Sequence, residues 1–380
     1  MQAQCVRCGR SLQGALCPNC GYDLSVDYRR WPTVQAVPRG AGGMRPDRSP
    51  LDPQRELERL RAEQDRGKQR AILDRWRTLA EEGDAAAQFL MGMRCEHRIF
   101  MRRSLHQAAE WYGKAAAQGY AAAQNGLGNC YYNGCGVKRN YETAAEWYRK
   151  AARQELAEAQ NNLGNCFCNG RGVKRNYETA AEWYRKAALQ DYAAAQTNLG
   201  NCYYSGRGVQ ADDILAAFWY KKAANQGDVQ AQKRLGDCYS LGEHVPQDLE
   251  KAAGWYRKAA EQGDAQAQRR LGDLCRQGQG VAKNPVQAAK WYQKAAEQGD
   301  ESARQSLEDP DFQFELAECY YFGRQTAEDE AEAVQWYQKA AWQGHKGAME
   351  ALSLCYRHGR GVSRSLIQAA IWQLRSKGAR

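Results

Sequence analysis

The feature that most constrains the fold of this chain is one motif that recurs at a fixed spacing. WYGKAA begins at Trp111, and close copies begin every 36 residues, at Trp147, Trp183, Trp219, Trp255 and Trp291. The next copy, at Trp336, lies 45 residues further on, and a degenerate copy places Trp372 another 36 residues along. Self-similarity with this period predicts a stack of repeated units rather than separate globular domains. The seventh unit therefore contains an insertion.

Each unit is expected to fold as two helices joined by a turn. In residues 120–155, helical spacing relates Ala123, Leu127 and Cys130, which predicts a first helix. We call this helix A, and Gly134 is expected to end it. Asn140 is placed to cap a second helix, helix B, which carries the WY pair; Asn176, Asp212, Asp248 and Asn284 repeat that role. With only 9 prolines and few alternating β-branched residues, the chain is predicted to be all-α, with strands expected only near the N-terminus.

The repeated blocks resemble the Sel-one-like repeat (SLR) family, which is tetratricopeptide-like. The AxAQxxLGxxY block, the GxGV turn and the AxxWYxKAAxQG block carry this resemblance, and they cover about residues 84–380. The resemblance implies an α/α superhelical solenoid of about eight helix-turn-helix repeats. It also implies that the first helices line a concave groove and that such proteins assemble complexes.

Departures from the repeated pattern give local expectations. Glu155 and Asp191 stand where other units place Gly after helix B. Because Glu adopts a left-handed conformation poorly, the turn at Glu155 is expected to differ. The insertion around Asp309 and Pro310 is expected to break or extend helix A of the seventh unit. Residues 51–83 are expected to form capping helices at the N-terminal end of the solenoid.

Two CxxC pairs near the N-terminus predict a zinc ribbon in residues 1–24. Cys5, Cys8, Cys17 and Cys20 bring four thiolates to one ion, and a Gly follows each pair. One structural Zn²⁺ is the expected cofactor, and a redox dithiol is the alternative. Residues 25–50 lack apolar periodicity and are predicted to be a flexible linker.

The other cysteines are expected to pack inside the repeats. Cys130, Cys166, Cys202, Cys238, Cys319 and Cys355 occupy one equivalent position. Equivalent positions of neighbouring repeats lie roughly 8–10 Å apart, which is too far for a disulfide. The WY pairs are interpreted as interface core rather than as base-stacking aromatics, with Trp183 as the large residue that fills the gap in a central unit.

Charge and motifs exclude several classes of function. The net charge of +10 is spread along the chain, which makes nucleic acid an unlikely partner. No apolar run is long enough to span a membrane and no signal peptide is apparent, so a cytoplasmic location is expected. The five His are scattered and no phosphate loop or nucleophile elbow occurs, so the chain is not expected to be an enzyme.

The candidate binding surface is a polar stripe along the helices A. Polar residues recur one turn apart on otherwise apolar helices. The predicted partner-binding residues are Asn125, Asn129, Tyr132, Asn161, Asn165, Asn201, Tyr204, Lys233 and Arg269. The predicted function is a scaffold or adaptor that binds a peptide or protein segment there, although a merely solvated face explains the same pattern. The alternative function is nucleic-acid association through the ribbon and the arginines Arg7, Arg10, Arg29 and Arg30.

Overall fold

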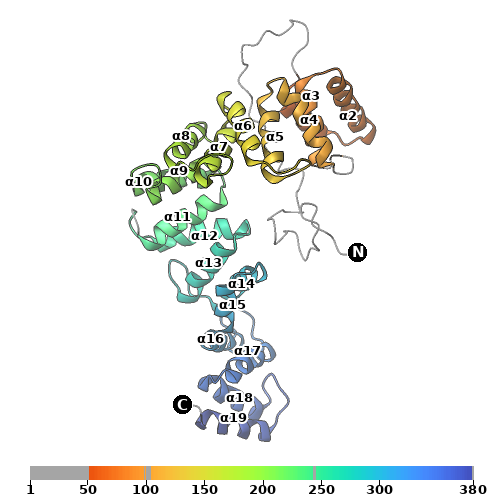
Figure 1. Ribbon diagram of the computed structural model, residues 1–380. Helices are drawn as coiled ribbons and strands as arrows, with labels where there is room; N and C mark the ends of the chain where they lie inside the picture. Colours follow the sequence, from red (N-terminus) through yellow and green to blue (C-terminus); the bar gives the residue numbers. More distant parts are fainter. Residues whose placement is uncertain (1–50, 98, 100–103, 243–244, 379–380) are drawn as a thin grey trace. The chain divides into compact units, whose positions relative to one another are not determined.

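The computed structural model describes residues 51–97, 99, 104–242 and 245–378. Within these ranges it contains 19 helices and no strand, which confirms the all-α prediction. The chain divides into two compact units, one ending at Ala216 (unit 1) and one beginning at Ala217 (unit 2) (Figure 1). The predicted zinc ligands Cys5, Cys8, Cys17 and Cys20 and the predicted linker 25–50 lie outside the described residues.

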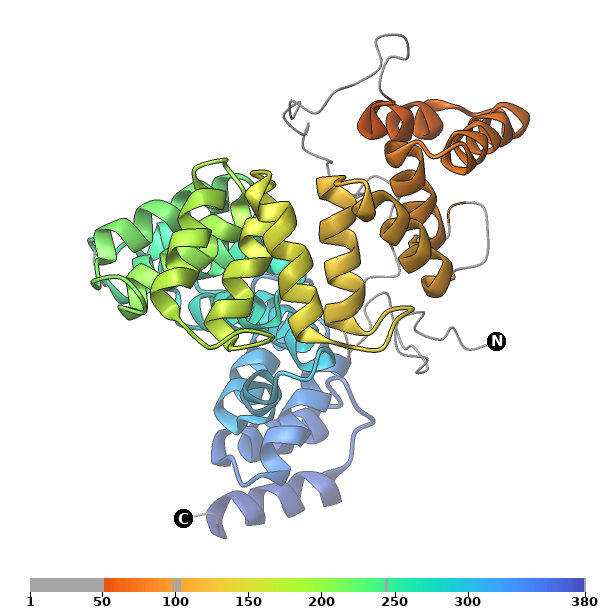
Figure 2. The same ribbon diagram turned by 45° about the horizontal axis from the view of Figure 1, so that its top comes forward.

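Sixteen of the helices alternate as helices A and B in the order that the repeats predict. The helices A are α3 (Ala85–Glu96), α5 (Ala121–Asn133), α7 (Ala157–Asn169), α9 (Ala193–Ser205), α11 (Val229–Leu241), α13 (Ala265–Gln277), α16 (Pro310–Tyr321) and α18 (Lys346–His358). The helices B are α4 (Leu105–Ala117), α6 (Tyr141–Arg153), α8 (Tyr177–Ala188), α10 (Asp213–Asn225), α12 (Leu249–Glu261), α14 (Pro285–Glu297), α17 (Glu330–Trp342) and α19 (Leu366–Gly378). Within unit 1, consecutive helices from α5 to α9 pack side by side, as the yellow and green ribbons of Figure 2 show. Before the first pair come α1 (Pro53–Ala62) and α2 (Arg66–Glu81), in the range where capping helices are expected.

The tyrosine of each WY pair is buried in the core between the two helices, whereas the tryptophan is only half-buried in every pair except the one that contains Trp219. Tyr184 is only 3% exposed. Its ring packs against Gly164 of helix A so closely that a Cβ on that glycine would lie 2.6 Å from a ring carbon. Trp183 is only half-buried, with the Lys186 ammonium 4.4 Å from its ring centroid. The expectation that Trp183 fills the gap is therefore wrong, because neighbouring helix positions point about 100° apart and only one can face helix A.

The turns follow the predicted chemistry, with one correction. The five predicted caps each accept a backbone N–H of the following helix; Asn140, for example, accepts from Glu142 and Thr143 of α6. Glu155 adopts φ 62° and Asp191 φ 59°, in the left-handed region where Gly119 also lies. The expectation of a different turn at Glu155 is therefore wrong, since the flanking helices impose the same backbone conformation on a residue that disfavours it.

The insertion breaks helix A of the seventh unit into two helices, as one of the two expected outcomes. The short helix α15 (Glu301–Glu308) starts as a helix A would, with Asp300 as cap and Ala303 buried. Asp309 then ends it and caps α16, in which Pro310 is the first residue. The last carbonyls of α15 accept hydrogen bonds from Gln313 and Gln343, as the end of a helix B does elsewhere.

The repeat cysteines lie inside the repeats. All six members of the equivalent set are buried free thiols, which confirms the packing interpretation over a disulfide ladder. Burial raises the pKa of the Cys166 thiol to about 11. A buried thiol held in its neutral form is a packing residue rather than a reactive nucleophile.

Candidate functional site

Asparagines of the predicted polar stripe accept hydrogen bonds from buried tyrosines of their own repeats. The hydroxyl of buried Tyr148 donates to Oδ1 of Asn129 at 2.7 Å, and that of Tyr184 donates to Oδ1 of Asn165 at 2.8 Å. A buried tyrosine needs such an acceptor, because an unpaired hydroxyl in the core is costly. The amide oxygens of Asn129 and Asn165 are therefore used within their own repeats.

A second set of amides links successive helices A in unit 1. Nδ2 of Asn162 donates to Oδ1 of Asn125 at 3.0 Å, and Nδ2 of Asn198 donates to Oδ1 of Asn161 at 2.8 Å. Asn125 and Asn161 are only 3% and 5% exposed. The sequence predicts an exposed stripe at these two positions, and that expectation of exposure is wrong, because the next repeat covers them and supplies the bonding amide.

The remaining stripe residues of unit 1 lie at the surface to different degrees. Asn129, Asn165 and Asn201 are half-buried, and so is Tyr132, whose hydroxyl accepts a hydrogen bond from Arg171 at 2.6 Å. Tyr204 is 41% exposed. We call the outward side chains of α5, α7 and α9 the unit 1 A-face.

Some amide atoms of the unit 1 A-face have no hydrogen bond within the described chain. Asn165 uses its oxygen for Tyr184 and for Asn198, but its Nδ2 donates to no described residue. Asn162 and Asn198 donate through Nδ2, whereas their Oδ1 atoms accept no hydrogen bond from the described residues. These three asparagines therefore present one unused donor and two unused acceptors on neighbouring helices.

Glu158 is the single charged residue in the sequences of α5, α7 and α9. It is half-buried, and its carboxylate is hydrogen-bonded by the side chains of Asn125 and Asn129. Burial raises the pKa of Glu158, and the two amide hydrogen bonds lower it by less than burial raises it. The ionised carboxylate is therefore less stable in the folded chain than in the unfolded one.

Glu158→Gln is expected to stabilise the protein at neutral pH and not in acid. Because the folded pKa of Glu158 is raised, ionisation costs stability as pH rises above the ordinary value of 4.5, and a glutamine avoids that cost. The thermal midpoint of the variant should exceed that of the wild type at pH 7, and the difference should shrink below pH 4.5. A difference that stays constant with pH would contradict this account of Glu158.

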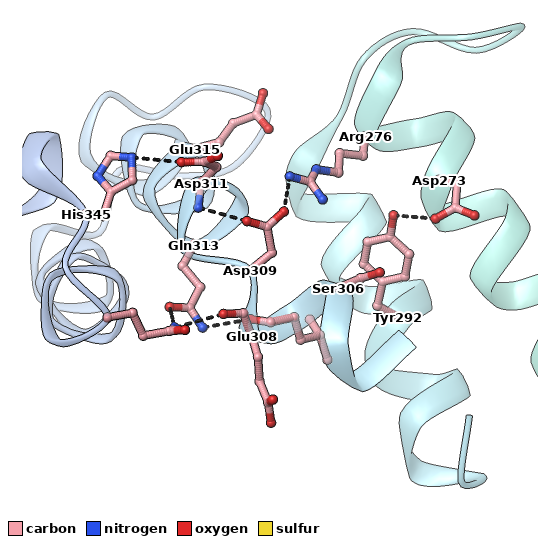
Figure 3. A network of polar contacts seen from close by, with 12 residues as sticks. Asp273, Arg276, Tyr292, Ser306, Glu308, Asp309, Asp311, Gln313, Glu315 and His345 are labelled. Atoms are coloured by element: carbon pink, nitrogen blue, oxygen red, sulfur yellow. Dashed lines mark hydrogen bonds and ion pairs between the residues drawn. The ribbon is translucent and has the colours of Figure 1, made fainter. Parts of the chain in front are cut away.

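In unit 2 the stripe is charged, and its charges pair between neighbouring helices. Lys233 lies 3.6 Å from Asp264, the cap of α13, and Arg269 lies 3.4 Å from Asp300, the cap of α15. Figure 3 shows a further ion pair of α13, Arg276 with Asp309 at 2.5 Å, beside the hydrogen bond from Tyr292 to Asp273. The predicted binding residues Lys233 and Arg269 thus already hold ion-pair partners within the chain.

A ladder of glutamine pairs runs through the repeats, each pair with one buried and one exposed member, and the sequence pattern alone did not indicate its role. Gln154, at the end of α6, donates to Oε1 of Gln124 at 2.9 Å, and Gln124 donates to the carbonyl of Ala116 at 3.3 Å, at the end of the preceding helix B. The same bonds join Gln262, Gln232 and the carbonyl of Ala224 in unit 2. The signal was present, since both glutamines recur in every regular repeat. The ladder closes helix ends that would otherwise be unsatisfied.

The described residues hold no group of three or more His, Cys, Asp or Glu side chains placed to bind a metal ion. No helix among them is both long and apolar enough to cross a membrane.

Stacked helix pairs with this internal bonding define a helical-repeat protein. The chain belongs to the Sel1 repeat family, whose model matches residues 85–120, 121–156, 157–192, 193–228, 229–264, 265–300, 310–345 and 347–373. The gap between the sixth and seventh matches is the segment that contains α15. No curated protein matches the chain.

Two solved structures are similar to this chain. One is c5321, a protective antigen of uropathogenic Escherichia coli strains that displays an SLR fold, with 36% identity, a TM-score of 0.59 and coverage of 80% of this chain. This chain spans 64% of the length of that protein. The other is a Sel1 repeat protein from Oxalobacter formigenes, with 30% identity, a TM-score of 0.50, and coverage of 71% of this chain and 99% of that one. Sel1 repeat proteins are generally non-enzymatic scaffolds for protein–protein interactions.

Proposed function

We propose that this protein is a scaffold whose unit 1 A-face binds an extended peptide segment of a partner protein. The observation that carries the proposal is the set of unused amide atoms on that face, the Nδ2 of Asn165 and the Oδ1 atoms of Asn162 and Asn198. A peptide unit has one N–H donor and one C=O acceptor, so it is satisfied by such a set whatever side chains it carries.

The charge of the face favours a peptide backbone over an ionic ligand. Glu158 is the one charged residue of α5, α7 and α9, and its carboxylate is already held by two amides. A partner therefore meets neutral polar groups, flanked by the phenol of Tyr204. Aromatic side chains of this kind add contact area at low entropic cost. The repeat brings equivalent groups back on each helix A, so the contacts recur along the bound segment.

The test begins with peptides selected from a displayed random library on the full-length protein. Asn198→Arg is the test variant. The equivalent positions of the next two repeats hold Arg234 and Arg270, so a repeat with arginine at this position should still fold. Loss of an amide contact and the added bulk should weaken the selected peptides about tenfold or more. The matched control is Glu182→Arg, at an exposed position of helix B α8. Selected peptides that bind both variants with wild-type affinity would contradict the proposal.

We further propose that the protein works in the cytoplasm, with protein rather than nucleic-acid partners. The support for this location is the abundance of reduced, buried thiols.

We also propose that Cys5, Cys8, Cys17 and Cys20 bind one structural Zn²⁺. The support is the spacing of the two CxxC pairs. Elemental analysis of the purified protein should find about one zinc per chain. Chelation should remove the zinc and leave the helical circular dichroism of the repeats unchanged; a chain free of zinc would contradict the assignment.

A further inference from the structure

The first repeat buries an arginine where other repeats bury an uncharged side chain. Arg94 of α3 is 8% exposed. The equivalent residues one repeat apart are Cys130, Cys166, Cys202, Cys238 and Leu274, and each of them is buried and apolar. A charge at a core position of an otherwise regular repeat breaks a local rule at a cost to stability, which is a signature of a functional site.

The guanidinium of Arg94 is incompletely paired. Its Nε donates to the carbonyl of Ile99 at 3.3 Å, but its Nη1 is buried and has no hydrogen-bond partner. Burial lowers the pKa of Arg94, and the nearby positive charge of Arg77 lowers it further. Asp74 raises this pKa by less than burial lowers it, so the buried cation is only partly compensated, and an anion that contacts its guanidinium would be bound firmly.

Arg94 lines a cavity of about 330 Å³ between α2, α3 and α4. Its charged walls are Arg77 and Glu81 from α2 and Glu110 and Lys114 from α4, so with Arg94 three positive groups face two negative ones and the net charge is +1. Met91 and Trp111 supply apolar surface. The volume lies at the small end of the range for ligand sites.

We propose that this cavity binds a carboxylate carried on a short apolar stem. A carboxylate matches the planar guanidinium in shape and forms strong charge-assisted hydrogen bonds with it. One negative charge balances the net charge of the lining, whereas a phosphate dianion would leave an excess negative charge beside the two glutamates. The stem lies against Met91 and Trp111. Because the site is lined by residues of α2, α3 and α4 and by none of the unit 1 A-face, it is independent of the peptide-binding proposal.

The probes are a matched pair, N-acetyl-leucine and its neutral amide, added to the full-length protein and followed by saturation-transfer NMR. N-acetyl-leucine should bind with a dissociation constant of about 1 mM, and the amide at least about tenfold more weakly. Inorganic phosphate should compete poorly. Equal binding of acid and amide, no binding of the acid, or efficient displacement by phosphate would overturn the carboxylate assignment.

Arg94→Leu provides the decisive variant, because Leu274 fills the equivalent position in the sixth repeat and the fold should persist. This variant should lose the binding of N-acetyl-leucine, and its thermal midpoint should equal or exceed that of the wild type, since an unpaired buried charge has been removed. Arg153→Leu is the matched control, at an exposed position of α6, and should bind as the wild type does. Retained binding in Arg94→Leu would overturn the proposal whatever its midpoint.

Discussion

Tyr184→Ala is expected to lower the free energy of unfolding by about 3–5 kcal/mol, the range for truncation of a large buried aromatic residue. Tyr184 is 3% exposed, packs on Gly164 and donates its hydroxyl to Asn165. The alanine leaves a cavity and an amide oxygen without its donor. Urea denaturation followed by circular dichroism measures the loss.

The neighbouring tryptophan provides the control for that measurement. Trp183 is half-buried beside the Lys186 ammonium, so Trp183→Ala should cost only about 1–2 kcal/mol. The order of the two losses distinguishes the observed packing from the sequence interpretation. A larger loss for Trp183 than for Tyr184 would show that the tryptophan forms the core.

Gly172→Ala is expected to cost about 2–6 kcal/mol, from backbone strain and overpacking together. Gly172 has φ +72°, and its added Cβ would lie 1.9 Å from the carbonyl oxygen of Tyr141 at the start of α6. Neither the loop nor the helix end can move without disturbing the contact between repeats.

Gly119→Ala is the matched control for the glycine prediction. Gly119 has φ +86°, but a Cβ there would meet no atom within 4 Å, and the equivalent positions hold Glu155 and Asp191. Only the cost of the left-handed conformation, about 1–2 kcal/mol, should appear. Similar midpoints for the two alanine variants would mean that the close approach at Gly172 does not stabilise the stack.

The fold could be predicted from the sequence because its determinants recur. The 36-residue period sets the number and order of helix pairs, and Asn140 and its equivalents mark where each helix B begins. Which aromatic of the WY pair faces the core could not be derived from one helix alone. The answer depends on Gly164, a residue of the other helix that admits the ring of Tyr184.

The candidate site was less predictable, because its hydrogen bonds join residues of different repeats. Asn125 reads as a surface residue on its own helix, but its oxygen accepts from Asn162 of the next helix A, 37 positions along the chain. Helical periodicity describes one helix and contains no information about a neighbour that covers it. The unpaired Nη1 of Arg94 depends on the surroundings of three helices. A sequence pattern identifies the unusual arginine but not its missing partner.

The most direct test of the peptide-binding account is the affinity of Asn165→Asp for the selected peptides. Aspartate keeps the oxygen that accepts from Tyr184, as Asp237 and Asp273 do for Tyr256 and Tyr292 at 2.8 Å in unit 2, but it removes the unused Nδ2 donor. We expect the thermal midpoint to be unchanged. The peptide affinity should be weaker by about tenfold or more, because one hydrogen bond is lost and a carboxylate then faces a peptide carbonyl. Wild-type affinity in this folded variant would contradict the peptide-binding account.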